Sequence, residues 1–146
     1  MKIEAAAKDD LKALCEIENG LFDKNSFALT QQNFLYHIKK NPLFICKIED
    51  KAAGYILLLT HKKSAKLRVY SIAVKNEFQG KGIGLKLLEK SFAYAKKTGK
   101  KSIKLEVNTT NYHAIRLYEK AGFVKSGIAS NYYPDGADAL LLEKLL

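Results

Sequence analysis

The sequence predicts an α/β fold in which a central mixed β-sheet carries helices on both faces. Stretches rich in β-branched and aromatic residues alternate along the chain with stretches whose apolar residues follow helical spacing. The length of 146 residues is typical of one domain, and no internal repeat, low-complexity segment or linker divides the chain. Helices on both faces of one sheet bury the apolar sides of such elements most economically. We therefore expect residues 1–146 to form a single domain.

The N-terminal part is expected to begin with a short strand at residues 2–6, followed by two helices. Asp9 is placed to cap the first helix, and Asn19-Gly20 is placed to end it. Residues 21–28 are predicted to form a loop. Thr30 is placed to cap the second helix, which ends at Asn41-Pro42 because proline disfavours helical geometry in the residue before it.

The other strands are expected at residues 43–48, 52–60, 66–74 and 102–107, with two more between Phe123 and the C-terminus around Pro134-Asp135-Gly136. The first two of these form a hairpin across the polar turn at residues 49–51. A helix follows residues 66–74 and runs to about Thr98, where Gly99 suits a helix C-cap. The last helix spans residues 111–121 and ends at Gly122.

A glycine-rich loop between the strand at residues 66–74 and the next helix gives the strongest functional signal. Gly80, Gly82 and Gly84 occupy alternate positions just before apolar residues with helical spacing. Without Cβ atoms, the backbone can aim several N–H groups at one oxyanion. The helix N-terminus adds a partial positive charge, worth about 0.3–1 kcal/mol to an anion. The loop therefore indicates a phosphate-binding site, and the alternative is a flexible loop that merely starts a helix.

The glycine spacing excludes two common phosphate loops, since neither Gly-x-x-x-x-Gly-Lys-Ser/Thr nor Gly-x-Gly-x-x-Gly occurs. The segment Gln79-Gly80-Lys81-Gly82-Ile83-Gly84 instead resembles the Gln/Arg-x-x-Gly-x-Gly/Ala signature of the GNAT acetyltransferase superfamily. The resemblance implies a GNAT-like fold, in which the amides of this loop hold the pyrophosphate of acetyl-coenzyme A (acetyl-CoA). It also implies that the end of the preceding strand, Ile72-Ala73-Val74, lines the acetyl and pantetheine part through its backbone.

The second half of the chain, from about residue 66 to 146, resembles the RimI branch of this superfamily. The stretches that carry the resemblance are Leu105-Glu106-Val107-Asn108, Asn111, Ala114, Leu117-Tyr118-Glu119-Lys120, Gly122-Phe123 and Asn131-Tyr132-Tyr133-Pro134. That branch acetylates protein N-termini, and its namesake acts on an N-terminal alanine of a small-subunit ribosomal protein. The resemblance implies Glu106 as general base, Tyr118 as general acid beside the cofactor, and Asn111 as a residue that holds the pantetheine arm. The alternatives are a solvated strand residue for Glu106 and a core aromatic for Tyr118.

These roles suit acetyl transfer to an amine. An ammonium cannot attack a thioester, so a base must take its proton, and a positioned carboxylate typically contributes about 10²–10⁴-fold. The pKa of an α-amine, about 7.7–8.0, lies below that of lysine, about 10.4, which lowers the cost of deprotonation by about 3.4 kcal/mol. The departing thiolate then needs a proton, which a phenol with an ordinary pKa of about 10 can supply.

Two loops are expected to border the acceptor groove. The resemblance places residues 21–27 there, and Phe22 and Phe27 are candidate contacts. We expect Tyr132 and Tyr133 to face them from the other loop and to contact an extended peptide backbone. In the RimI branch the first loop commonly carries a Phe-Pro-Trp-like element, whereas this chain has no tryptophan. The identity of the peptide therefore stays open, and core packing is the alternative for the two phenylalanines.

Charge is unevenly distributed along the chain, whose net charge is +10. Residues 51–104 contain 14 basic and two acidic residues, whereas the flanking segments are close to neutral and would not repel a cationic peptide. A basic zone around a polyphosphate cofactor is one interpretation, and a lysine-biased surface is the other. Nucleic-acid contact would favour arginine interleaved with aromatic residues, of which the sequence has little, so no nucleic-acid partner is expected.

Several other kinds of site are not expected. Cys15 and Cys46 form neither a Cys-x-x-Cys motif nor a disulfide framework, so both are expected to be reduced, idle thiols. His37, His61 and His113 show no metal-ligand spacing, so no metal is expected. No apolar run of about 18 residues and no signal-peptide core occur, so we expect a cytoplasmic protein without membrane contact.

Together these features predict an acetyl-CoA-dependent N-acetyltransferase acting on a primary amine, with a protein N-terminal α-amine as the expected acceptor. Attack is direct, with a base and an acid and no covalent enzyme intermediate. The alternatives are a GNAT enzyme for a small amine or amino sugar, and a non-catalytic module that binds CoA or RNA.

Overall fold

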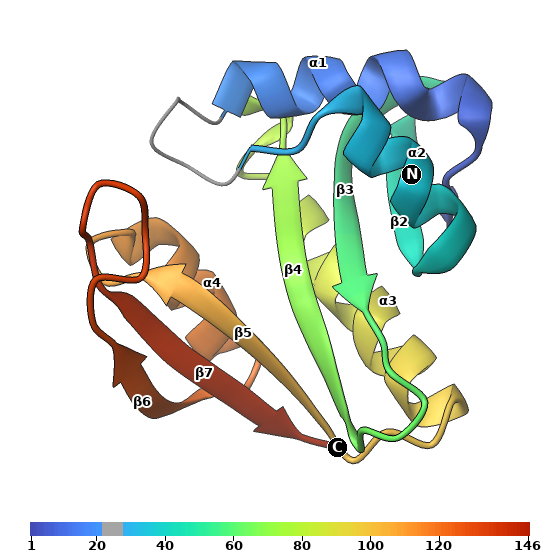
Figure 1. Ribbon diagram of the computed structural model, residues 1–146. Helices are drawn as coiled ribbons and strands as arrows, with labels where there is room; N and C mark the ends of the chain where they lie inside the picture. Colours follow the sequence, from blue (N-terminus) through green and yellow to red (C-terminus); the bar gives the residue numbers. More distant parts are fainter. Residues whose placement is uncertain (22–27) are drawn as a thin grey trace.

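The computed structural model describes residues 1–21 and 28–146, which contain a seven-stranded sheet in the order β1-β2-β3-β4-β5-β7-β6 (Figure 1). Neighbouring strands run antiparallel except β4 and β5, which are parallel, so the predicted mixed sheet is confirmed. The bounds of the strands are β1 (Lys2–Ala5), β2 (Leu43–Ile48), β3 (Lys51–Leu59), β4 (Lys66–Val74), β5 (Ser102–Asn108), β6 (Val124–Ala129) and β7 (Ala139–Leu145). The bounds of the α-helices are α1 (Leu11–Leu21), α2 (Gln31–Lys40), α3 (Ile83–Lys97) and α4 (Tyr112–Lys120).

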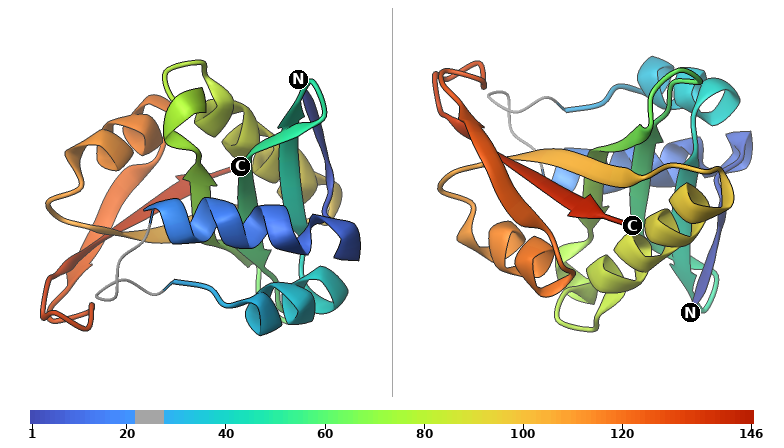
Figure 2. Two further views of the ribbon diagram at one scale, coloured as in Figure 1. Left: turned by 90° about the horizontal axis from the view of Figure 1, so that it is seen from above. Right: turned by 90° about the horizontal axis from the view of Figure 1, so that it is seen from below.

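Helices cover both faces of the sheet, with α1 and α2 on one side and α3 and α4 on the other (Figure 2). The central strand β3 supplies side chains to both cores. Tyr55 and Leu57 lie in the core with α1 and α2, whereas Ile56 and Leu58 lie in the core with α3. Because both faces of β3 are buried, its sequence is a nearly continuous apolar run instead of an alternation.

The first helix differs from the prediction at both ends. A 3₁₀ turn, η1 (Lys8–Asp10), precedes α1, and Asp10 instead of Asp9 accepts a hydrogen bond from the Ala7 N–H at 2.9 Å. Asp10 is favoured because its other oxygen pairs with Lys47 of β2 at 2.9 Å, which leaves Asp10 only 8% exposed. At the other end α1 continues to Leu21, past the predicted stop at Asn19-Gly20, since Gly20 does not take up the positive φ of a helix-ending glycine.

The remaining predicted boundaries agree with the structure to within about a residue. Thr30 caps α2, with its hydroxyl accepting a hydrogen bond from the Asn33 N–H at 3.1 Å. Gly99 and Gly122 follow the ends of α3 and α4 with φ of +77° and +102°, values that favour glycine. Of the predicted loop at residues 21–28, Leu21 belongs to α1 and residues 22–27 lie outside the described residues.

The parallel pair β4 and β5 separates part-way along its length (Figure 1). Its pairing runs from Lys66 opposite Ser102 to Val69 opposite Leu105. The next residue, Tyr70, is an extra residue in the ladder with β3, because Val69 and Ser71 pair with consecutive residues of that strand. Such a bulge bends and twists the strand that carries it. The C-terminal half of β4 thus keeps β3 on one edge while its other edge is turned away from β5.

Candidate active site

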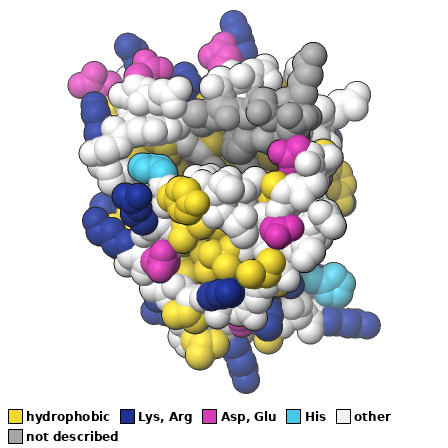
Figure 3. All heavy atoms as spheres, turned by 90° about the vertical axis from the view of Figure 1, so that its left-hand side faces the viewer, with side chains coloured by type: hydrophobic (Ala, Val, Ile, Leu, Met, Phe, Trp, Pro, Cys, Tyr) yellow, Lys and Arg dark blue, Asp and Glu magenta, His cyan; other side chains and the backbone are white. Residues whose placement is uncertain are grey.

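A cavity of about 840 Å³ occupies the opening between β4 and β5. It is lined by the end of β4, the loop and first turn of α3, β5, α4, and the loop between β6 and β7. The space-filling view shows a hollow on this face, with hydrophobic side chains, drawn in yellow, gathered beside it (Figure 3). We call residues 72–74, 79, 80 and 82–84 the glycine-loop half of the cavity. Arg68, Glu106, Tyr132 and Tyr133 form the carboxylate half.

The glycine-loop half presents mainly backbone. Gly80 and Gly82 have φ of +79° and +78°, in the left-handed region that favours glycine. Gly82 is the N-cap of α3, and among the described residues no side chain caps this helix. The first N–H groups of a helix have no partner within it, so those at the start of α3 are available to an anion at the cavity wall. This geometry fits the pyrophosphate of acetyl-CoA.

Gln79 and Lys81 differ from the glycines in what their side chains do. Gln79 lines the cavity, but its Nε2 donates to the Val74 carbonyl oxygen at 3.0 Å and to Asn76 Oδ1 at 3.2 Å. Its side chain therefore ties the loop to the end of β4. The Lys81 Nζ lies 5.7 Å from the centre of the Phe78 ring, and Lys81 is not among the described residues that line the cavity. A direct contact between Lys81 and the cofactor thus stays a prediction.

The other predicted cofactor residues line the same cavity, namely Ile72, Ala73, Val74, Ile83, Gly84, Asn111 and Tyr118. Asn111 also caps α4, because its Oδ1 accepts a hydrogen bond from the Ala114 N–H at 3.2 Å. Its amide NH₂ is consequently the group with which it can bind a ligand. Tyr118 is buried and packs on Phe123, with ring centres 5.9 Å apart, so it is a core aromatic and a cavity residue at once.

Among the described residues, the Lys and Arg side chains at the cavity come mostly from outside the segment that the charge distribution indicated. Of the 14 basic residues in 51–104, all of them described, Arg68 is the one that lines the cavity. Arg116 and Lys120, four residues apart on α4, line it as well, with His113 one turn earlier. Most lysines of the central segment are exposed. The interpretation of that segment as a lysine-biased surface is therefore favoured over a basic wall around the cofactor.

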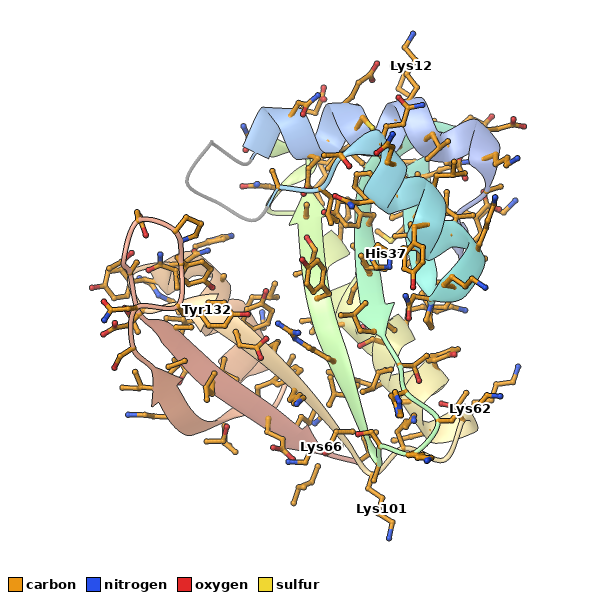
Figure 4. All side chains as sticks on the ribbon, viewed as in Figure 1. Lys12, His37, Lys62, Lys66, Lys101 and Tyr132 are labelled. Carbon is orange, nitrogen blue, oxygen red and sulfur yellow. The ribbon has the colours of Figure 1, made fainter. Side chains whose placement is uncertain are left out.

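The carboxylate half is built from side chains of three separate elements. Arg68 Nε of β4 donates to Glu106 Oε2 of β5 at 3.0 Å. Arg68 Nη2 donates to the Tyr132 hydroxyl at 2.9 Å, and Figure 4 shows Tyr132 on its loop beside the opening between the strands. The Arg68 and Glu106 side chains are 30% and 19% exposed, respectively. Glu106 is thus an ion-paired residue of the cavity wall, which argues against the alternative of a solvated strand residue.

Two tyrosines of the cavity, Tyr118 and Tyr133, have raised pKa values and are weaker acids than free tyrosine. Burial raises the pKa of Tyr118 well above its ordinary value, and the nearby Tyr133 raises it further. Burial, followed by the neighbouring Tyr132 and Glu106, raises the pKa of Tyr133 to about 12. The expectation of an ordinary phenol at position 118 is therefore wrong. Both phenols keep their protons at neutral pH and remain hydrogen-bond donors.

A buried hydrogen-bond chain behind β4 was not predicted. Glu18 of α1 is 1% exposed and accepts hydrogen bonds from the Tyr55 hydroxyl and, at 2.6 Å, from the Leu29 N–H. The Tyr55 hydroxyl also bonds Ser71 Oγ at 2.7 Å, and Ser71 lines the cavity. Burial raises the pKa of Glu18. The sequence does hold one signal, since Glu18 lies four residues after the buried Leu14 and so falls on the apolar face of its helix.

Several expectations concern other parts of the chain. Phe22 and Phe27, the predicted acceptor contacts, lie outside the described residues. Within residues 1–21 and 28–146, no three or more His, Cys, Asp and Glu side chains group as a metal site would require, and no helix is long and apolar enough to span a membrane. Cys15 and Cys46 are free thiols, and burial raises the pKa of both, which keeps them protonated and unreactive.

Comparisons with known proteins identify the family of this chain and confirm its fold. Residues 11–123 match the model of the acetyltransferase (GNAT) family. An N-alpha-acetyltransferase of Saccharolobus solfataricus is 35% identical over 126 residues, covering 77% of this chain and 75% of that protein. An N-alpha-acetyltransferase of Sulfolobus acidocaldarius is 30% identical over 154 residues, covering 97% of this chain and 90% of that protein. The solved structure of the ribosomal-protein-S18-alanine N-acetyltransferase from Escherichia coli matches with a TM-score of 0.85 and 28% identity, covering 99% of this chain and 92% of the other.

Proposed function

Because this chain belongs to the GNAT acetyltransferase family and is an acetyl-CoA-dependent N-acetyltransferase, we propose that its acceptor is the α-amino group of a protein N-terminus. The predicted family, fold, enzyme class and co-substrate are confirmed. A non-catalytic module is no longer an alternative. The acceptor is supported by the names of the two relatives, both called N-alpha-acetyltransferases.

The observation that carries the proposal is the presence of both halves in one cavity. A backbone site for a pyrophosphate and an ion-paired carboxylate beside two loop tyrosines line the same space. Bound at the glycine loop, acetyl-CoA would supply a thioester carbonyl carbon for attack by a neutral amine. The chain must then provide a base for the amine and a donor for the sulfur.

We assign Glu106 as the general base for the acceptor amine. Its carboxylate takes a proton from the acceptor ammonium, directly or through one water, before or as the nitrogen–carbon bond forms. Tyr118 is assigned to the sulfur, to which it donates its hydroxyl hydrogen as the carbon–sulfur bond breaks. Its raised pKa favours a hydrogen bond to the developing thiolate over early transfer of the proton.

The α-amine is preferred to a lysine side chain for two reasons. Its pKa is about 7.7–8.0, whereas that of lysine is about 10.4, so a larger fraction of the α-amine is already neutral near neutral pH and its deprotonation costs less free energy. Tyr132 and Tyr133 are half-buried on the loop between β6 and β7, with ring centres 5.0 Å apart, and offer rings and hydroxyls to an extended peptide backbone.

The test is acetyl-CoA turnover with three kinds of acceptor. These are a peptide with a free N-terminus, its N-terminally blocked and lysine-bearing counterpart, and a panel of small amines and amino sugars. We expect turnover with the first, and mass spectrometry should locate the acetyl group on its N-terminal residue. Acetylation of lysine in both peptides would contradict the proposal. Turnover confined to small amines would favour the alternative acceptor class.

A further inference from the structure

Arg68 holds the carboxylate half together, although nothing in its sequence context marks it. Its guanidinium makes two directed hydrogen bonds, from Nε to Glu106 and from Nη2 to Tyr132, at 3.0 and 2.9 Å. It also lies 5.4 Å from the centre of the Tyr70 ring, the bulged residue of β4. The three partners come from β4, β5 and the loop after β6, so Arg68 connects elements that are far apart in the sequence.

The position of Arg68 in the sheet explains this reach. Its neighbour Val69 is the last residue of β4 that pairs with β5, so Arg68 lies where the two strands begin to part. It pairs in register with Lys104, and residues two apart on a strand share a face. Glu106, two residues beyond Lys104, therefore lies on the same face as Arg68. A long, forked side chain is needed to bridge from this point to the carboxylate and the loop together.

Only one oxygen of Glu106 is used by this contact. Arg68 bonds Oε2, and among the described residues no hydrogen bond is made to Oε1. Oε1 is thus the oxygen that is left for the proton of an acceptor amine. Because a guanidinium forks in a plane, it fixes the orientation of the carboxylate more tightly than an ammonium could.

We propose that Arg68 is a positioning residue that couples the base to the acceptor loop. It aims Oε1 of Glu106 at the amine and, through Tyr132, sets the loop that borders the acceptor at the same time. This proposal rests on the proposed role of Glu106 as general base. It adds that the orientation of Glu106 depends, through Arg68, on the loop between β6 and β7. The ion pair is only partly exposed, so it is screened less than a surface pair.

The test compares Arg68→Lys in the wild-type chain and in a Glu106→Gln background. Lysine keeps the charge but lacks the planar fork that directs one hydrogen bond to each partner. We therefore expect kcat to fall about 10- to 100-fold, the range of a hydrogen bond to a charged group, while the KM for acetyl-CoA is unchanged. In the Glu106→Gln background the same substitution should have almost no further effect on kcat, because no base is left to aim. Tyr132→Phe removes only the hydroxyl that Arg68 bonds and should raise the KM for the acceptor. This variant tests the link between Arg68 and the loop if Arg68→Lys does not fold.

Lys104→Gln is the matched control. It removes a cation that pairs in register with Arg68 but makes no hydrogen bond or ion pair with Glu106 in the described chain, so kcat should be unchanged. Equal losses of kcat from Arg68→Lys in both backgrounds would overturn the proposal, as would wild-type kcat in Arg68→Lys or in Glu106→Gln. All ratios are measured with whichever amine the wild-type protein acetylates. The test of the coupling between Arg68 and Glu106 is therefore independent of whether that amine is a protein N-terminus.

Discussion

The glycine-loop half and the carboxylate half of the cavity present different kinds of groups to their ligands. The first offers backbone amides and glycines from one continuous segment, residues 72–84, at the start of a helix. The second offers charged and phenolic side chains that are separated by 38 and 64 positions in the sequence. A site made of backbone depends on local chain geometry, whereas a site made of side chains depends on how the strands pair. We therefore expect single substitutions in the glycine-loop half to change acetyl-CoA affinity, and those in the carboxylate half to change acetyl transfer.

The largest effect on acetyl-CoA binding is expected at Gly82, where the backbone has a φ of +78°. Asp and Asn both tolerate this region better than other residues and have nearly the same shape, so the pair isolates charge. Gly82→Asp should weaken acetyl-CoA binding about 100-fold, because a carboxylate replaces open space beside the pyrophosphate site. Gly82→Asn should weaken it much less. Calorimetric titration of acetyl-CoA into both variants measures the difference.

Equal affinities of the folded Asp and Asn variants would mean that no phosphate binds at the loop. The space matters here, since a Cβ at Gly82 would meet nothing within 4 Å. A Cβ at Gly82 is therefore expected to crowd only the bound ligand and not the protein. At Gly84, by contrast, a Cβ would lie 3.0 Å from a methyl carbon of Leu117, so a substitution there also strains the contact with α4.

A smaller effect is expected at Tyr118, which lies between the two halves. Tyr118→Phe should lower kcat about tenfold by removing a hydrogen bond to the developing thiolate. Because burial raises the pKa of Tyr118, the phenol stays protonated between about pH 6 and 9, so the ratio of wild-type to variant kcat should be constant across that range. A ratio that declines toward the alkaline end would show that the phenol titrates there and would contradict its raised pKa.

The smallest effect is expected at Glu18, which is connected to the cavity residue Ser71 through the Tyr55 hydroxyl. Glu18→Gln should lower the free energy of unfolding by about 1 kcal/mol, because the amide NH₂ cannot accept the Leu29 N–H. Burial raises the folded-state pKa of Glu18, so its protonated form is favoured by folding. The wild-type advantage over Glu18→Gln should therefore be largest in acid, below the unfolded pKa of about 4.3, and shrink as the pH rises through the folded-state pKa.

Urea unfolding of both proteins at several pH values measures this trend. Glu16→Gln on the exposed side of α1 is the matched control and should show no such pH dependence. An advantage that grows with pH would mean that the hydrogen bonds from Tyr55 and Leu29 outweigh burial at Glu18.

The same division explains what could be predicted from the sequence. Gln79 to Gly84 form a contiguous motif whose order of strand, loop and helix needs no tertiary information. The bond between Arg68 and Glu106 depends on the parallel register of β4 with β5, which alternation within one strand does not reveal. The lysine-rich composition of residues 51–104 predicted a basic zone there around the cofactor. Of the basic residues in that segment, all of them described, only Arg68 lines the cavity, and Arg116 and Lys120 of α4 line it as well.

Tertiary contacts also decided local details. The sequence predicts Asp9 as the cap of the first helix, but the side chain of Asp10, which pairs with Lys47 of β2, is the one that accepts the Ala7 N–H. Glu18 lies on an apolar helix face, where a carboxylate finds partners only because Tyr55 of β3 points to the same core. Helical spacing identifies that face, but it cannot show that a hydrogen-bond donor from another element lies against it.

The most direct test of the account is to measure acetyl-CoA binding and acetyl transfer by Glu106→Gln in one preparation. If the halves act separately, the affinity for acetyl-CoA is that of the wild-type protein, while kcat falls about 10²–10⁴-fold at a pH below the α-amine pKa of about 7.7–8.0. The loss should shrink above that pH, where the acceptor is neutral without help. Wild-type kcat at acidic pH would contradict the role of Glu106, and a loss of acetyl-CoA affinity as large as the loss of kcat would contradict the division of the cavity.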